Sequence, residues 1–327
     1  MVGNLRSSQR SFIASDSPLH RALMPLLYYE IFSYPLTLEE ILRFNHDSDS
    51  NVGELQEALD ELEAQSYVFR YQKYYLTRDC PDWIIRREEH NARAERFLGK
   101  AQLMTHLIRR FPFVRGVFLS GSLSKNVMPK DGDIDYFVIT EAGRLWIART
   151  LLVLFKKIFL LNSYKYFCVN YFVDIEHLEI EEKNRFTATE IVTLLPVYNP
   201  QLYQRFYEAN HWVGSYFPHS LPRSTRGTIA QHSGWGKRLL EKLLRGRWGD
   251  WLDAFFMKRT LGYWNRKFKS LNPNNFSIAL KSRRYVSKHH PQDFQHRVMN
   301  AYEARIQDFE ERHFLQVERQ AVWQLKD

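Results

Sequence analysis

Two short hydrophobic segments enclose a glycine and serine pair and a pair of aspartates, and this arrangement constrains the fold more than any other feature. Residues 114–119 have the composition of a β-strand and lead into residues 120–122, Ser-Gly-Ser. Ten residues then separate Ser122 from Asp133. A second strand-like segment follows over residues 134–139, and it contains Asp135. Because side chains alternate along a strand, we expect Asp133 and Asp135 to face the same side.

These residue types together suit one kind of chemistry. Two carboxylates that point the same way repel each other unless a dication lies between them, and hard oxygen ligands suit Mg²⁺. A glycine followed by a serine at a strand end lets the backbone approach a phosphate, and hydroxyl and amide groups can bond its oxygens. Phosphoryl and nucleotidyl transfer need metal and phosphate at one site, so the pattern predicts that class of reaction.

Residues 116–139 resemble the signature of the nucleotidyltransferase superfamily, which includes DNA polymerase beta, poly(A) polymerases and the minimal bacterial nucleotidyltransferases. That signature is a hydrophobic strand, Gly-Ser, a spacer of this length and then Asp-hydrophobic-Asp-hydrophobic. Ile134 and Tyr136 occupy the hydrophobic positions here. The resemblance covers residues 115–174, about a fifth of the chain. The segment 184–190 is also similar to one found in uncharacterised bacterial members of the superfamily.

The resemblance implies Mg²⁺ or Mn²⁺ as cofactor, a nucleoside triphosphate (NTP) as substrate, and Asp133 and Asp135 as catalytic residues and metal ligands. It assigns nucleotide binding to four residues at the end of the first strand, namely Ser120, Gly121, Ser122 and Lys125. A solvated loop lysine explains Lys125 equally well. The predicted function is metal-dependent transfer of a nucleoside monophosphate from an NTP to an acceptor that the sequence does not define.

A third carboxylate on a later strand normally completes the triad of this superfamily, as a metal ligand or general base. The strand predicted over residues 166–173 carries Asn170 at its centre instead, which departs from the pattern. Asp174 has the same parity as Asn170, roughly 13 Å further along at about 3.3 Å per residue. We therefore take Asp174 as the candidate third catalytic residue and metal ligand, and Asn170 as a candidate neutral substitute. If neither serves, the chain is a catalytically weakened module that binds nucleotide or another protein.

The N-terminal part, residues 18–80, reads as a winged-helix-like domain. Its predicted elements are three helices and a hairpin, over residues 19–32, 38–44, 52–65 and 67–77. The third predicted helix carries several Asp and Glu residues but no Lys or Arg, and phosphate contacts require cations. A protein partner or a scaffolding role therefore suits this domain better than DNA binding.

The remaining chain is expected to form a nucleotidyltransferase domain over residues 83–217 and a basic α-helical region over residues 235–320. A leading helix covers residues 83–111, and the order strand, loop, strand, helix, strand then defines a mixed unit. Further helices are predicted over 143–161, 186–195, 200–217, 237–244, 251–268 and 291–317. Thr187 and Glu190 have the spacing of a capping box. The predicted class is α+β with a mixed-sheet core.

The formal net charge is +9, and the excess of cations is concentrated in one region. Between His219 and His290 sixteen Lys or Arg residues stand against three acidic residues, interleaved with aromatic side chains. Aromatics among cations suit nucleic acid, the surface of a membrane, or a helical bundle with solvated charges. A polymeric acceptor such as nucleic acid is therefore one possible partner.

Other classes are disfavoured by composition. The longest apolar run, residues 151–161, is interrupted by Lys156 and Lys157 and is shorter than the roughly 20 residues that span a bilayer. We therefore expect no transmembrane segment, and no secretory signal is recognisable. The two cysteines form no CxxC pair and cannot build a disulfide framework. A cytoplasmic protein is the expectation.

Overall fold

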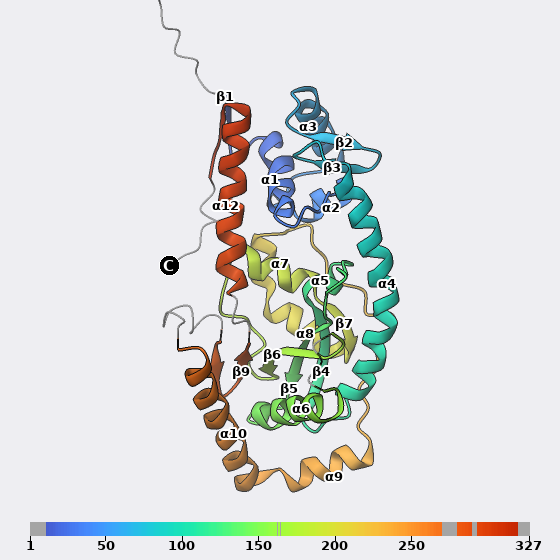
Figure 1. Cartoon of the computed structure of the whole chain (residues 1–327), viewed down its shortest axis with the longest axis vertical. Coiled ribbons are helices and arrows are strands. Elements are labelled where there is room, and N and C mark those ends of the chain that lie inside the picture. The colour runs from blue at the N-terminus through green and yellow to red at the C-terminus, as the bar shows by residue number, and fades with distance from the viewer. Residues whose placement is uncertain (1–10, 162, 164, 270–279, 290–292, 320–327) are drawn as a thin grey trace, which may run out of the picture.

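The computed structural model describes residues 11–161, 163, 165–269, 280–289 and 293–319. It is an α+β structure in which a mixed six-stranded sheet is surrounded by helices (Figure 1). This coarse class agrees with the expectation from the sequence.

The strand order in the central sheet is β7-β4-β5-β6-β9-β8. These strands are β4 (Val114–Ser120), β5 (Asp135–Thr140), β6 (Cys168–Asp174), β7 (Leu195–Tyr198), β8 (Ser282–Arg283) and β9 (Val286–Lys288). Only β5 and β6 pair in parallel, and the helix α6 (Leu145–Phe159) connects them. The other pairs are antiparallel. The strands predicted over 114–119, 134–139 and 166–173 are thus confirmed to within two residues.

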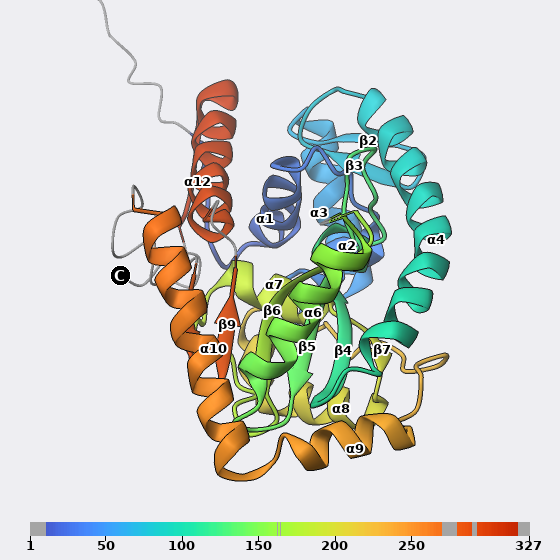
Figure 2. The same cartoon turned by 60° about the horizontal axis from the view of Figure 1, so that its bottom comes forward.

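Alternating side chains divide the sheet between two hydrophobic clusters. Val117, Leu119 and Val138 pack with α4 (Asp82–Ile108) and α6, whereas Phe118 and Phe137 pack on the opposite face. That opposite face is covered by α7 (Arg185–Thr193) and α8 (Pro200–Ala209), and the 3₁₀ helix η1 (His211–Ser215) follows α8. Figure 2 shows α6 lying across the sheet.

The N-terminal elements are α1 (Pro18–Glu30), α2 (Leu38–Arg43), α3 (Val52–Ala64), β2 (Phe69–Tyr71) and β3 (Tyr74–Leu76), as the periodicity predicted. Polar caps begin each helix, and the side chains of Ser17, Thr37 and Asn51 each accept a backbone N–H bond. An isolated bridge between Leu36 and Tyr75 joins the hairpin to the segment before α2.

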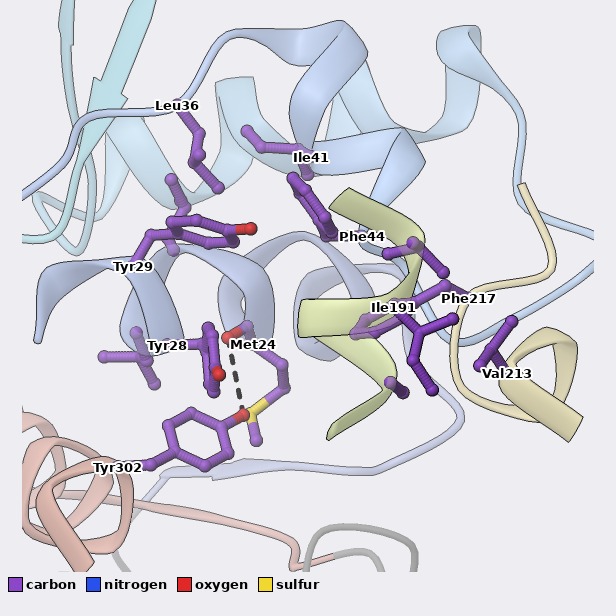
Figure 3. Close-up of a cluster of buried hydrophobic side chains, with 14 of the residues drawn as sticks. Met24, Tyr28, Tyr29, Leu36, Ile41, Phe44, Ile191, Val213, Phe217 and Tyr302 are labelled. Atoms are coloured by element: carbon purple, nitrogen blue, oxygen red, sulfur yellow. Dashed lines mark hydrogen bonds between the residues drawn. The ribbon is translucent and has the colours of Figure 1, made fainter. Parts of the chain in front are cut away.

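The N-terminal helices share a core with later elements of the chain. Tyr28 lies edge-on to Tyr302 of α12 (Phe294–His313), and the Tyr302 hydroxyl donates to the Met24 carbonyl at 3.4 Å (Figure 3). Phe44 packs against Phe217, which follows η1. One hydrophobic cluster therefore joins the N-terminal helices to the sheet and to α12.

The region 235–320 differs from the all-helical expectation. It contains α9 (Trp235–Leu243), α10 (Gly246–Lys267) and α12, but also β8, β9 and β10 (Leu315–Val317). β9 satisfies the backbone groups along the edge of β6, and β10 pairs in parallel with β1 (Ser11–Ile13). The last helix ends at His313 because Phe314 adopts a left-handed conformation, with φ of 54°. Its predicted start, Pro291, lies outside the described residues.

Over the part of the chain that the structure describes, none of the helices combines the length and apolar character needed to cross a membrane.

Candidate functional site

The turn after β4 brings the backbone of Gly121 against the carboxylate of Asp135. Ser120 and Asp135 are directly paired across β4 and β5. Gly121 has φ of +64°, and a Cβ atom at this position would lie 2.3 Å from Oδ2 of Asp135. Only glycine therefore fits between this turn and this carboxylate.

Asp133 and Asp135 lie together, as the alternation predicted. Ligand atoms of Asp133, Asp135 and Cys168 all lie within 4.8 Å of one another, in a group that could hold a metal ion. Burial, followed by the charge of Asp133, raises the pKa of Asp135 to about 7. The ionised form of Asp135 is thus disfavoured, and a bound dication would stabilise it.

Two of the three side chains in this group, Asp133 and Asp135, suit a hard cation. Burial raises the pKa of the Cys168 thiol, which hydrogen-bonds to Asp135, so its sulfur is protonated at neutral pH and is a poor ligand for Mg²⁺. The two carboxylates remain as oxygen ligands, which fit Mg²⁺ or Mn²⁺.

Asn170 occupies the position next to these carboxylates. Its Nδ2 donates to Oδ1 of Asp135 at 2.7 Å. Its Oδ1 is buried and accepts no hydrogen bond from the residues that the structure describes. A neutral amide therefore stands where the pattern calls for a third carboxylate, and one further oxygen is left for a ligand at this place.

Asp174 lies at the other end of β6, so the structure does not bring it together with Asp133 and Asp135. Because β5 and β6 run parallel, Asp135 is paired with Cys168 and Asp174 with Thr140, at the opposite ends of the two strands. Thr140 is five positions after Asp135, which corresponds to roughly 16 Å at about 3.3 Å per residue. The Asp174 carboxylate is buried and accepts bonds from the backbone N–H groups of Glu176 and His177, each at 3.0 Å. Its contacts are those of a residue that stabilises a turn.

Lys125 contacts the site rather than solvent alone. Its Nζ lies 2.8 Å from Oε1 of Glu190 and donates to the Gly121 carbonyl at 3.1 Å. Glu190 comes from α7 and is one of the charges that raise the pKa of Asp135. The capping role predicted for Thr187 and Glu190 is wrong, because the side chain of Asn184 caps α7.

The loop between Gly121 and Asp133 is anchored at several points. The Ser122 carbonyl accepts from the backbone of Lys125, and Ser124 Oγ donates to the Gly121 carbonyl at 2.9 Å. Met128 is fully buried, and its carbonyl accepts from Arg93 of α4 at 3.0 Å. These bonds hold the Gly-Ser turn and the middle of the loop in place before any ligand binds.

Cys168 and Glu190 are the neighbours of the site that sequence reasoning missed. Cys168 precedes Asn170 by two residues, so strand alternation was a usable signal that the two face the same side. No comparable signal existed for Glu190, which reaches the site through the packing of α7.

No family model matches the chain, and neither the curated proteins nor the solved structures include a significant match.

Two substitutions distinguish between Asn170 and Asp174 as the residue that takes the place of the third carboxylate. Asn170→Asp adds an anion beside Asp135 and should tighten Mn²⁺ binding by about tenfold, since affinity follows the charge of the ligand set. Asp174→Asn should leave Mn²⁺ binding unchanged and cost about 1–3 kcal/mol of unfolding free energy, because it disturbs buried hydrogen bonds. Mn²⁺ titration and urea unfolding of both variants measure these effects. Weaker Mn²⁺ binding in a fully stable Asp174→Asn would return Asp174 to the site.

Proposed function

We propose that the chain carries a metal-dependent nucleotidyltransferase site of the DNA polymerase beta type, which moves a nucleoside monophosphate from an NTP to an acceptor. The observation that carries the proposal is the contact between Gly121 and the Asp135 carboxylate, with Asp133 beside it. Gly121 has no side chain, so the backbone of its turn can bind a phosphate. The carboxylates of Asp133 and Asp135 lie next to this turn and can bind a cation.

The roles of the residues follow from their positions. Asp133 and Asp135 would hold Mg²⁺ or Mn²⁺, and such an ion neutralises charge on phosphate oxygens during transfer. The Gly121 turn leads into Ser122, whose half-buried hydroxyl is available to a triphosphate. Lys125 lies at the same turn and would exchange its partner Glu190 for a phosphate oxygen.

A second candidate is a catalytically weakened module of the same fold, which binds nucleotide or protein without efficient transfer. The neutral Asn170 beside Asp135 favours it, because a carboxylate normally fills the third position. With Asp174 at the far end of β6, no aspartate of the described part of this strand takes over.

The order of the N-terminal elements supports a winged-helix-like module. The acidic residues of α3 include the exposed Glu57, Glu61 and Glu63, which are unfavourable toward DNA. A protein partner suits this surface better. Nucleic acid as an acceptor rests on the basic C-terminal region, where Arg283 is already paired with Glu181 at 3.1 Å.

An experiment in two steps distinguishes the candidates. The full chain is titrated with each of the four NTPs in the presence and absence of Mn²⁺, and pyrophosphate release is then followed with the NTP that binds. Metal-dependent binding with pyrophosphate release indicates a transferase. Binding without release indicates the weakened module, and absence of metal-dependent binding contradicts both.

A further inference from the structure

Helix α9 presents its apolar residues to solvent. Trp235 is 77% exposed, Leu239 51%, Leu240 48% and Leu243 64%. Soluble proteins rarely leave a continuous row of leucines uncovered, so an exposed row of this kind marks a binding surface.

Two charged residues of α9, Lys237 and Glu241, point inward and fix this orientation. Nζ of the buried Lys237 donates to the carbonyls of Arg109 and Val114, at 2.9 and 2.6 Å. The buried Glu241 accepts from the Phe113 backbone and pairs with Arg115, both at 2.7 Å. Because these bonds hold Lys237 and Glu241 against the start of β4 and the residues before it, the leucines cannot turn toward the core.

A row of exposed aromatic side chains lies on the first turns of α10, the helix that follows α9. Trp248 and Trp251 stack with ring centroids 4.9 Å apart, and Trp251 and Phe255 stack at 5.4 Å. All three rings are exposed. Figures 1 and 2 show α9 and the start of α10 together at one edge of the molecule. The α9–α10 face is defined here by Trp235, Leu239, Leu240, Leu243, Trp248, Trp251 and Phe255.

The charges around the α9–α10 face are strongly asymmetric. The acidic residues of these helices are bound to the rest of the protein, Glu241 by Arg115, Asp250 by Arg144 and Asp253 by the backbone of Ile147. Six cations of this segment are exposed, and none of them forms an ion pair with an acidic side chain of the described residues. They are Arg238, Lys242, Arg245, Arg247, Lys258 and Arg259.

A cavity of about 440 Å³ lies at the start of α9, beside Trp235. Arg109, Arg110, His232 and Lys237 contribute to its lining, and no acidic residue does among those described. The pocket is open to solvent, and Arg109, Arg110 and His232 are the lining residues that could contact a phosphate, since Nζ of Lys237 is bonded to two backbone carbonyls.

We propose that the α9–α10 face binds the surface of an anionic lipid bilayer. Leucine and tryptophan side chains would enter the boundary between headgroups and acyl chains, the surrounding cations would attract anionic headgroups, and the cavity beside Trp235 would accept a headgroup phosphate. A nucleic acid would use the rings and cations but would leave the three leucines exposed to water, so a lipid surface fits better. The inference is independent of the function proposed for the Asp133 and Asp135 site.

The test is cosedimentation of the full chain with vesicles of equimolar phosphatidylcholine and phosphatidylglycerol. The triple variant Leu239→Ala, Leu240→Ala, Leu243→Ala should lower the partition coefficient by at least about tenfold, because it removes apolar groups that enter the bilayer. Replacing Arg238, Lys242 and Arg245 with Gln should lower it by about fivefold for each charge removed. The variant Ile85→Ala, Leu103→Ala is the control, since these residues of α4 are as exposed, at 59% and 66%. It should bind like the wild type.

Three outcomes would overturn the proposal. One is equal binding to vesicles of phosphatidylcholine alone, which removes the role of charge. Another is wild-type binding by a leucine variant whose melting temperature is unchanged. The third is no vesicle binding, with the α9–α10 face required instead for binding single-stranded RNA or for self-association in sedimentation velocity.

Discussion

Replacing Asp135 with asparagine is expected to abolish Mn²⁺ binding and, at the same time, to raise the melting temperature near pH 8. Burial and the charge of Asp133 raise the pKa of Asp135 to about 7, from an ordinary value of 3.8. Between these two values the folded protein binds more protons than the unfolded chain. Stability conferred by the neutral form is therefore present below pH 3.8 and is lost as pH rises toward 7.

Asparagine cannot ionise, so the variant avoids this loss while its side-chain oxygen can still accept from Asn170. Each pKa unit corresponds to about 1.4 kcal/mol, and about 1 kcal/mol shifts the melting temperature by roughly 2–4 °C in a large domain, so an increase of several degrees is expected. Calorimetry at pH 5 and pH 8 measures it, and the difference between variant and wild type should be smaller at pH 5. In the wild type, Mn²⁺ affinity should rise about tenfold per pH unit below pH 7, because binding displaces one proton.

Asp131→Asn is the control for this substitution. Asp131 is exposed on the same loop, two residues before Asp133, and its replacement should change neither quantity. A lower melting temperature of Asp135→Asn at pH 8 would contradict the raised pKa of Asp135. Mn²⁺ binding that survives the change would show that the two aspartates do not form a cation site.

Replacing Gly121 with alanine adds one methyl group. This change is expected to disrupt the site more than a methyl group added at any other position. The left-handed conformation of Gly121 costs an alanine about 1–2 kcal/mol. The added Cβ would also lie 2.3 Å from the Asp135 carboxylate, so either the turn or the carboxylate must move. The variant should lose at least about 2 kcal/mol of unfolding free energy and most of its Mn²⁺ affinity.

The matched control is Gly99→Ala on the exposed side of α4, where a Cβ would meet nothing within 4 Å. That variant should be stabilised by up to about 1 kcal/mol, because alanine favours the helix. Urea unfolding and Mn²⁺ titration of both variants give the comparison. Wild-type Mn²⁺ affinity in Gly121→Ala would refute the close packing of turn and carboxylate.

The part of the site that could be predicted from the sequence is the part that depends on local geometry. The Gly-Ser turn, the spacer and the alternation of Asp133 and Asp135 lie within one stretch of chain, so their proximity follows from strand periodicity. Asp174 was assigned by parity alone. A helix between two strands favours parallel pairing, which places the start of β6, and hence Cys168 and Asn170, next to Asp135. The same rule argued against Asp174.

Elements that depend on distant partners were not predictable. The basic segment that contains β8 and β9 becomes strand because the edge of β6 offers unpaired backbone groups. Helical periodicity would bury Leu239 and Leu243 of α9, but bonds from Lys237 and Glu241 to the end of β4 and its neighbours reverse the helix. Long-range polar contacts overrode local patterning in both cases.

We propose that Asp133 and Asp135 hold a metal–nucleotide complex at the Gly121 turn. The most direct measurement is calorimetric titration of the full chain with ATP at pH 8, with and without Mn²⁺, for the wild type, the double variant Asp133→Asn, Asp135→Asn, and Asp131→Asn. We predict ATP binding that requires Mn²⁺ in the wild type and in Asp131→Asn and that is absent in the folded double variant. Equal ATP binding by the double variant, or binding by the wild type that does not depend on Mn²⁺, would contradict the claim.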